Sequence, residues 1–179
     1  MRYPMMLLAL AGASLLTGCS SLISLNPFIT DAQATTDPRL AGTWKNPNAD
    51  DKDAFTIEQK GSRYVIKFTT EKSETTTFDA RVARIGDMEF MDLVDTDDNP
   101  FVVPVHMLIR VWMNDGKLQW AILDSRWLRE QVKDLLPTQE NEDRTLITTQ
   151  GSTVTELLQK FGAEERAHGD TNDLVKIAK

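Results

Sequence analysis

The sequence predicts a mainly β domain with two helices, in which an antiparallel meander of strands closes into a barrel or half-barrel. Between residues 42 and 123, short stretches rich in branched and aromatic residues alternate in polarity, as strands with a buried face do. Turn-forming residues separate these stretches at short, regular intervals. After residue 123, two segments have the apolar spacing and end signals of helices.

Seven strands joined by tight turns are expected in the meander, and two more after it. Gly61-Ser62, Gly86-Asp87 and Asn114-Asp115-Gly116 mark three turns, and the last is the strongest hairpin signal in the chain. A twisted sheet of about nine strands tends to close, because closure removes its exposed edges. The expected strands cover residues 42–44, 54–60, 63–70, 76–85, 88–94, 103–113, 117–123, 144–149 and 174–178.

Both expected helices have recognisable ends. The first is capped by Asp124 or Ser125 and stops before Pro137, which cannot continue a helix. The second follows the capping box Thr153-Val154-Thr155-Glu156 and stops at Gly162. Each has an apolar stripe on one face, and the two helices are expected to plug or flank one end of the barrel.

Composition and charge exclude several classes of function. Apolar residues make up 41% of the 179-residue chain and charged residues 26%, as in ordinary globular proteins. The formal net charge of −7 argues against binding to nucleic acid or to anionic lipid headgroups. The chain has one cysteine, so no internal disulfide is expected.

The first 18 residues have the pattern of a removable export signal. Arg2 gives a positive start, and residues 5–16 are apolar or small. As a helix this run of about 12 residues spans roughly 18 Å, whereas a bilayer core is about 30 Å thick. We therefore interpret it as a signal peptide and not as a permanent membrane span.

The motif Leu16-Thr17-Gly18-Cys19 resembles the lipobox of bacterial lipoprotein precursors, in which an aliphatic and two small residues precede a cysteine. The resemblance implies cleavage between Gly18 and Cys19, a diacylglyceryl thioether on Cys19, and acylation of the new amino group with a fatty acid such as palmitate. Two or three acyl chains anchor a protein permanently. Ser20, where an aspartate would indicate inner-membrane retention, implies the outer membrane, with the domain facing the periplasm.

This interpretation divides the chain into three parts. Residues 1–18 are the signal peptide, residues 19–37 a lipidated tether, and residues 38–179 a single barrel-like domain. The polar composition of the tether indicates a flexible coil with a reach on the order of 25 Å. The tether also contains apolar residues, which are expected to contact either the membrane or the domain. These residues are Leu22, Ile23, Leu25, Phe28 and Ile29.

The segment Leu40-Ala41-Gly42-Thr43-Trp44 resembles the opening signature of calycins, the group that includes lipocalins and fatty-acid-binding proteins. In that group a Gly-x-Trp begins the first strand and the tryptophan seals the barrel base. The resemblance covers these residues and the meander pattern, and it implies a lipocalin-like barrel. The chain departs from a lipocalin in having two late helices with a strand between them. Trp44 as an ordinary core aromatic is the other interpretation.

No constellation of residues indicates catalysis or metal binding. His106 in an expected strand and His168 in an expected loop have different settings, and no cysteine can complete a zinc site with them. The acidic loop after Asp95 fails the calcium-loop pattern, because Pro100 and His106 stand where glycine and glutamate are needed.

For His106 we favour a structural hydrogen bond over ligand contact and over catalysis. As a general base it would need a nucleophile and an orienting carboxylate, and Asp92 or Asp124 would lie near it only through the accident of folding. We therefore expect no enzyme activity, no metal and no cofactor.

Two functions remain. The barrel binds a small apolar ligand or lipid, or it is a packed, ligand-free interaction module that docks another envelope protein. Interior volume distinguishes them. Both alternating sets of residues in the expected strand 103–113 are apolar. Residues 107, 109, 111 and 113 have the larger apolar volume, which slightly favours their pointing inward, and Arg110 would then face outward. The candidate residues for lining the ligand site or the core are Trp44, Phe68, Arg110, Trp112, Trp120 and His106.

Overall fold

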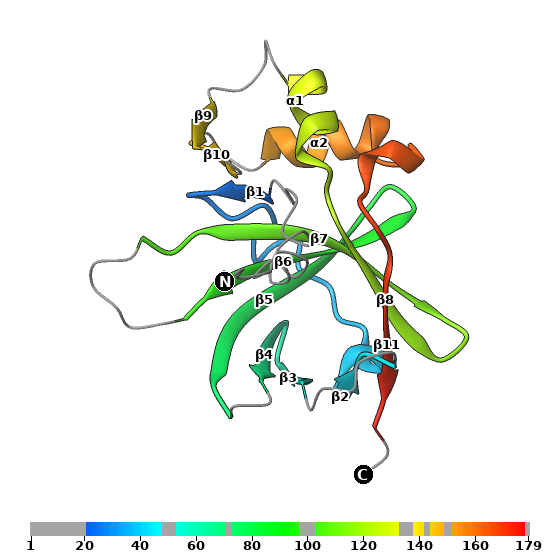
Figure 1. The fold of residues 1–179 in the computed structure, drawn as a ribbon. Helices are drawn as coiled ribbons and strands as arrows, with labels where there is room; N and C mark the ends of the chain where they lie inside the picture. Colours follow the sequence, from blue (N-terminus) through cyan, green and yellow to red (C-terminus); the bar gives the residue numbers. More distant parts are fainter. Residues whose placement is uncertain are drawn as a thin grey trace, which may run out of the picture.

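The computed structural model describes residues 21–47, 53–70, 73–96, 103–132, 138–141, 144–148 and 152–177. These residues form a mainly β domain with two α-helices on one side of a barrel (Figure 1). The lipobox motif with Cys19, the stop at Pro137 and most of the acidic loop after Asp95 lie outside the described residues.

Eight antiparallel strands close into a barrel, so the predicted lipocalin-like barrel class is confirmed in its closed form. Each strand pairs with the next along the chain, and the last one returns to pair with the first. The barrel strands are β2 (Gly42–Lys45), β3 (Ala54–Lys60), β4 (Arg63–Thr69), β5 (Thr75–Ile85), β6 (Met88–Asp95), β7 (His106–Asn114), β8 (Lys117–Ile122) and β11 (Asn172–Lys176).

Three short strands extend the sheet outside the barrel. β1 (Ser21–Ser24) pairs antiparallel with the start of β7 and parallel with β10 (Arg144–Ile147), which pairs in turn with β9 (Thr138–Asn141). The expected strand at residues 144–149 therefore exists but is not part of the barrel, which has eight strands and not about nine. β1 and β9 were not predicted, because neither is long enough to show alternation.

The helices pack on the outside of the barrel wall. α1 (Ser125–Val132) and α2 (Ser152–Phe161) bury Trp127, Leu128 and Leu158 against outward-facing residues of β5, β6 and β7. Asp124 is the predicted cap of α1, since its Oδ1 accepts hydrogen bonds of 2.8 Å from the backbone N–H groups of residues 126 and 127.

The barrel wall is consequently buried on both faces along part of its length. In β7, Ile109 and Val111 point into the barrel, and Leu108 points outward into the layer beneath the helices. Two hydrophobic cores result, one inside the barrel and one between wall and helices. This is why both phases of β7 are apolar in the sequence.

Trp44 closes one end of the barrel, which we call the base. It is fully buried, and its Nε1 donates to the carbonyl of Leu40 at the end of the short 3-10 helix η1 (Pro38–Leu40), at 2.8 Å. The ammonium of Lys176 lies 5.0 Å from the centre of the Trp44 ring. Gly42 has a φ of +146°, and a Cβ at this position would collide with the Lys176 side chain. The glycine of the Gly-x-Trp motif thus makes room for the residue that covers the tryptophan.

Residues 25–37, here called the strap, cross the outside of the barrel from β1 to the base (Figure 1). Phe28 and Ile29 are buried in the core beneath the helices. The backbone N–H of Thr35 donates to the carbonyl of Val82 in β5 at 2.7 Å. The expectation of a flexible tether is therefore wrong for the described residues 21–37, because β1 pairs with β7, Phe28 and Ile29 are buried, and Thr35 bonds to β5.

Side chains hold the far end of the strap. The carboxylate of Asp31 accepts from Arg63 at 2.9 Å and from Arg81 at 2.7 Å, and these two guanidinium groups lower the pKa of Asp31. The Tyr64 hydroxyl accepts from the backbone N–H of Asp37 and donates to its carbonyl. The strap is therefore tied to β4 and β5 before the chain enters the barrel.

Replacing Gly42 by alanine should destabilise the domain by about 1–3 kcal/mol, because its backbone φ of +146° favours glycine and the added methyl would displace the end of the Lys176 side chain from Trp44. Urea unfolding followed by tryptophan fluorescence measures the change. Gly169→Ala is the control, since a Cβ there makes only an ordinary contact of 3.6 Å. Equal stability of the two variants would contradict the claim that the base of the barrel requires glycine at position 42.

Candidate functional site

The interior of the barrel contains a cavity of about 190 Å³. Thirteen side chains line it, and all are apolar. The cavity opens at the end of the barrel opposite the base, where Phe55, Phe68 and Phe78 are half-buried. The lining residues are Phe55, Ile57, Ile66, Phe68, Phe78, Met91, Leu93, Met107, Ile109, Val111, Leu118, Trp120 and Leu174.

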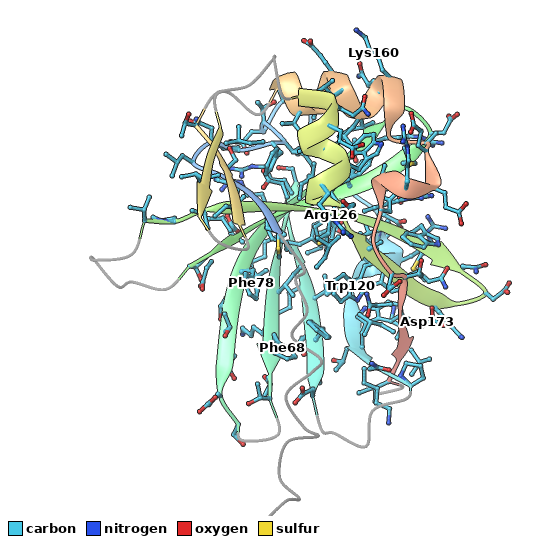
Figure 2. The ribbon with its side chains drawn as sticks, turned by 45° about the horizontal axis from the view of Figure 1, so that its top comes forward. Phe68, Phe78, Trp120, Arg126, Lys160 and Asp173 are labelled. Carbon is cyan, nitrogen blue, oxygen red and sulfur yellow. The ribbon has the colours of Figure 1, made fainter. Side chains whose placement is uncertain are left out.

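Strand register brings the aromatic side chains together at the open end. Phe55 in β3 lies opposite Phe68 in β4, and their rings stack with centroids 4.6 Å apart. Trp120 is on β8, four strands from β4 in either direction around the barrel, and so belongs to the opposite wall. Figure 2 shows Phe68 and Phe78 on neighbouring strands and Trp120 on a separate part of the wall. The opening is thus bordered by aromatic rings.

The base half of the barrel is filled. Leu40, Trp44 and Tyr64 are fully buried there and belong to the interior core, but they do not line the cavity. The barrel is therefore neither packed throughout nor hollow throughout, because large side chains fill one half and leave space in the other.

The structure separates the candidate residues chosen from sequence. Phe68 and Trp120 line the cavity, and Trp44 lies in the base. Arg110, Trp112 and His106 do not line the cavity, which corrects the expectation for them. They alternate with the inward-facing Met107, Ile109 and Val111, so they point to the outside of the wall.

Arg110 is half-buried on the outer face and stacks on an aromatic ring. Its guanidinium carbon lies 4.7 Å from the centre of the Trp112 ring, and burial lowers its pKa. Its buried Nε has no hydrogen-bond partner among the described residues. The aromatic partner of Arg110 is therefore Trp112, two residues away on the same face of β7.

His106 is bound to a buried carboxylate. Its Nδ1 lies 2.9 Å from Oδ1 of Asp92, which is 1% exposed, while Oδ2 accepts from the backbone N–H groups of Phe28 and Ile29 at 3.0 and 3.1 Å. Ser24 of β1 lies opposite His106, but it is fully buried and its hydroxyl accepts from the Asn26 N–H. The group joins the strap to the wall and presents no exposed nucleophile.

The second histidine is also held by a backbone group. Nε2 of His168 lies 2.7 Å from the carbonyl of Gly162, and burial lowers the pKa of the imidazole. The two histidines do not meet. Within the described ranges, no group of three or more histidine, cysteine, aspartate or glutamate side chains is placed to hold a metal ion.

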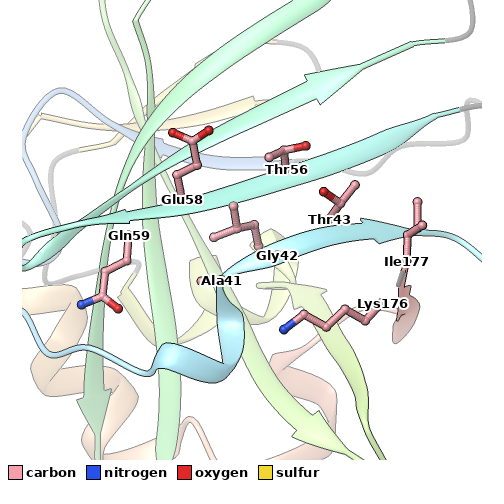
Figure 3. A pocket seen from close by; sticks show the side chains of 9 residues that line it. Ala41, Gly42, Thr43, Thr56, Glu58, Gln59, Lys176 and Ile177 are labelled. Carbon is pink, nitrogen blue, oxygen red and sulfur yellow. The ribbon is translucent and has the colours of Figure 1, made fainter. Parts of the chain in front are cut away.

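A second hollow, with a volume of about 900 Å³, is lined by residues at the β2 strand and its neighbours β3 and β11. Figure 3 shows Thr56 and Glu58 of β3 and Lys176 of β11 around it. Lys176 already covers Trp44, and Glu58 lies 3.9 Å from Lys60. Its polar groups do not converge on one point, so the interior cavity is the better candidate site.

Fold and site together define a closed, eight-stranded antiparallel barrel with an apolar interior cavity. In comparisons with known proteins, no family model matches the chain, and no curated protein and no solved structure matches it. In the part of the chain that the structure describes, no helix has the length and apolar character to cross a bilayer.

The sequence offered Asp92 and Asp124 as carboxylates for His106, and the structure shows that Asp92 is its partner. Asp92 is 14 residues from His106 along the chain, and β6 and β7 place the two on one face of adjacent strands. A polar residue at an outward position of an apolar strand was the available signal. Its interpretation required knowing that the strap covers this face.

Replacing Asp92 by alanine should cost about 3–5 kcal/mol, because it leaves two buried backbone N–H groups and a buried imidazole without their acceptor. His106→Ala should cost less, about 1–3 kcal/mol, since Asp92 keeps both backbone bonds. Urea unfolding gives both values. Neither change touches the cavity lining, so a loss of cavity binding by folded His106→Ala would contradict a structural role.

Proposed function

We propose that this chain is an envelope lipoprotein, anchored through Cys19, whose barrel binds a small apolar molecule or the end of a hydrocarbon chain. The observation that carries the proposal is the open cavity lined only by apolar side chains. A site of this kind gains its affinity by removing apolar ligand surface from water.

The size of the cavity limits what it can hold. An apolar protein cavity of about 150 Å³ binds benzene. The cavity of about 190 Å³ therefore suits one ring or a short alkyl segment. Sites for whole drug-sized molecules are about 300–1,000 Å³, so a long-chain lipid would place only the end of its chain inside.

The pairing of β1 with the barrel strand β7 changes the expected geometry of anchoring. β1 begins at Ser21, two residues after Cys19, and two residues extend at most about 7 Å. Acyl chains on Cys19 would therefore hold the barrel wall directly at the bilayer, most simply on the periplasmic side of an outer membrane. Hydrocarbon is then available to the cavity at high effective concentration, so modest affinity is sufficient.

Binding is tested with benzene, added to protein that starts at Ser20 and so retains the strap. Saturable, near one-to-one binding is expected in titration calorimetry. Met107→Trp should abolish it, because the larger side chain occupies the cavity, whereas Trp112→Phe on the outer face should not. If folded wild-type protein takes up no benzene, the ligand-free interaction module becomes the better account.

Anchoring is tested in cells. Cys19→Ala should abolish incorporation of labelled palmitate and leave an uncut precursor of larger mass, because the substitution removes the only sulfur that can carry the thioether. Ser20→Ala is the neighbouring control and should be processed normally. Normal processing and labelling of the Cys19 variant would refute the lipoprotein assignment.

A further inference from the structure

Two exposed apolar side chains lie close together where β1 ends and β7 begins. Within the described ranges, three large apolar side chains are exposed, namely Leu25 at 42%, Val103 at 67% and Ile177 at 40%. Ser24 of β1 is paired with His106 of β7. Leu25 directly follows Ser24, and Val103 stands three residues before His106. Single exposed apolar residues are ordinary, whereas a contiguous apolar patch marks a surface for a protein or a membrane.

This patch borders the opening of the cavity. β8 pairs with the later residues of β7 and β1 with the first ones, so β1 continues the wall at the open end. Ile23 of β1 lies opposite Met107, which lines the cavity. The patch continues both chains outward from this pair. We call Ile23, Leu25, Val103 and Val105 the apolar border.

The two stretches that carry the apolar border have no charged side chain. Residues 21–30 and 103–109 contain no aspartate, glutamate, lysine or arginine, although 26% of the whole chain is charged. Their only ionisable side chain is that of His106, which is buried and bound to Asp92. The net charge of −7 repels anionic surfaces. The apolar border therefore suits a surface without net charge.

The proposed anchor would bring lipid to this place. From Cys19, two residues extend at most about 7 Å, and the four residues of β1 span about 13 Å more. Acyl chains on Cys19 would thus keep the bilayer within roughly 20 Å of Leu25 and Val103. A bilayer is consequently the first large apolar surface that the border meets.

We infer that the apolar border is a bilayer-contact surface, in which Leu25 and Val103 enter the surface of an uncharged, zwitterionic membrane. The contact places the opening of the cavity against the lipid from which its ligand comes. This inference rests on the proposed function and adds to it a second, non-covalent attachment beside the cavity.

The test uses protein that starts at Ser20 and so lacks the anchor, sedimented with phosphatidylcholine vesicles. The bound fraction of the wild type should rise with lipid concentration. Leu25→Asp should weaken this binding about tenfold, because it removes an apolar contact and adds a charge. Ile177→Asp is the matched control, since Ile177 is equally exposed but follows β11 at the base, and it should bind as the wild type does.

Val103→Asp is the second variant and should weaken binding as Leu25→Asp does. Urea unfolding confirms that each variant is folded. Replacing part of the phosphatidylcholine by phosphatidylglycerol should weaken binding of the wild type at low salt, because the chain is acidic, and about 1 M salt should remove this difference.

Three results would overturn the inference. The wild type fails to sediment with phosphatidylcholine vesicles, or Ile177→Asp weakens binding as much as Leu25→Asp does. The third is a wild-type dimer in light scattering that Leu25→Asp converts to a monomer, which would assign the border to a second copy of the chain.

The outcomes also separate this inference from the function on which it rests. If benzene binds but the wild type does not sediment with vesicles, the contact surface is wrong and the apolar site stands. If the wild type sediments as expected but takes up no benzene, the contact surface stands and the apolar site is wrong.

Discussion

The buried carboxylate of Asp92 is the interaction on which the arrangement outside the barrel depends. A charge removed from water is tolerated only when hydrogen bonds replace its hydration. Asp92 takes part in three hydrogen bonds, two donated by strap N–H groups and one shared with Nδ1 of His106. Its position on the outer face of β6 therefore fixes the path of the strap, and the strap covers a wall that would otherwise expose apolar side chains. Phe28 and Ile29 occupy that covered surface.

The barrel itself was predictable, because two-residue periodicity and turn residues are local signals. The hairpin at Asn114-Asp115-Gly116 and the cap at Asp124 occur where the sequence placed them. The strap was not predictable, because its binding depends on distant partners such as Asp92 and Tyr64. Whether the Arg110 side chain points into or out of the barrel could not be predicted for a similar reason. Both faces of β7 carry apolar residues because both are covered, one by the barrel interior and the other by helices. Those helices come later in the chain, so no local signal in β7 indicates which face points inward.

The division of the barrel into a filled base and a hollow open half follows from where its large side chains lie. Trp44 and Tyr64 point toward the base, where backbone groups of Leu40 and Asp37 satisfy their polar atoms. At the other end, Phe55 and Phe68 stack on each other along the wall and leave the centre open. Tight interiors contain few voids larger than a water molecule. An apolar space of this size lowers stability, which is a reason to connect it with function.

The proposed anchor and the cavity are linked through β1. Ile23 lies opposite Met107, which lines the cavity, and Ser24 lies opposite His106 at the same end of β7. β1 therefore flanks the open half of the barrel and not its base. If acyl chains hold that strand at a bilayer, the wall nearest to the lipid is the wall of the cavity. Asp92 supports this placement of β1, because its bonds to the backbone of Phe28 and Ile29 hold the strap that directly follows β1.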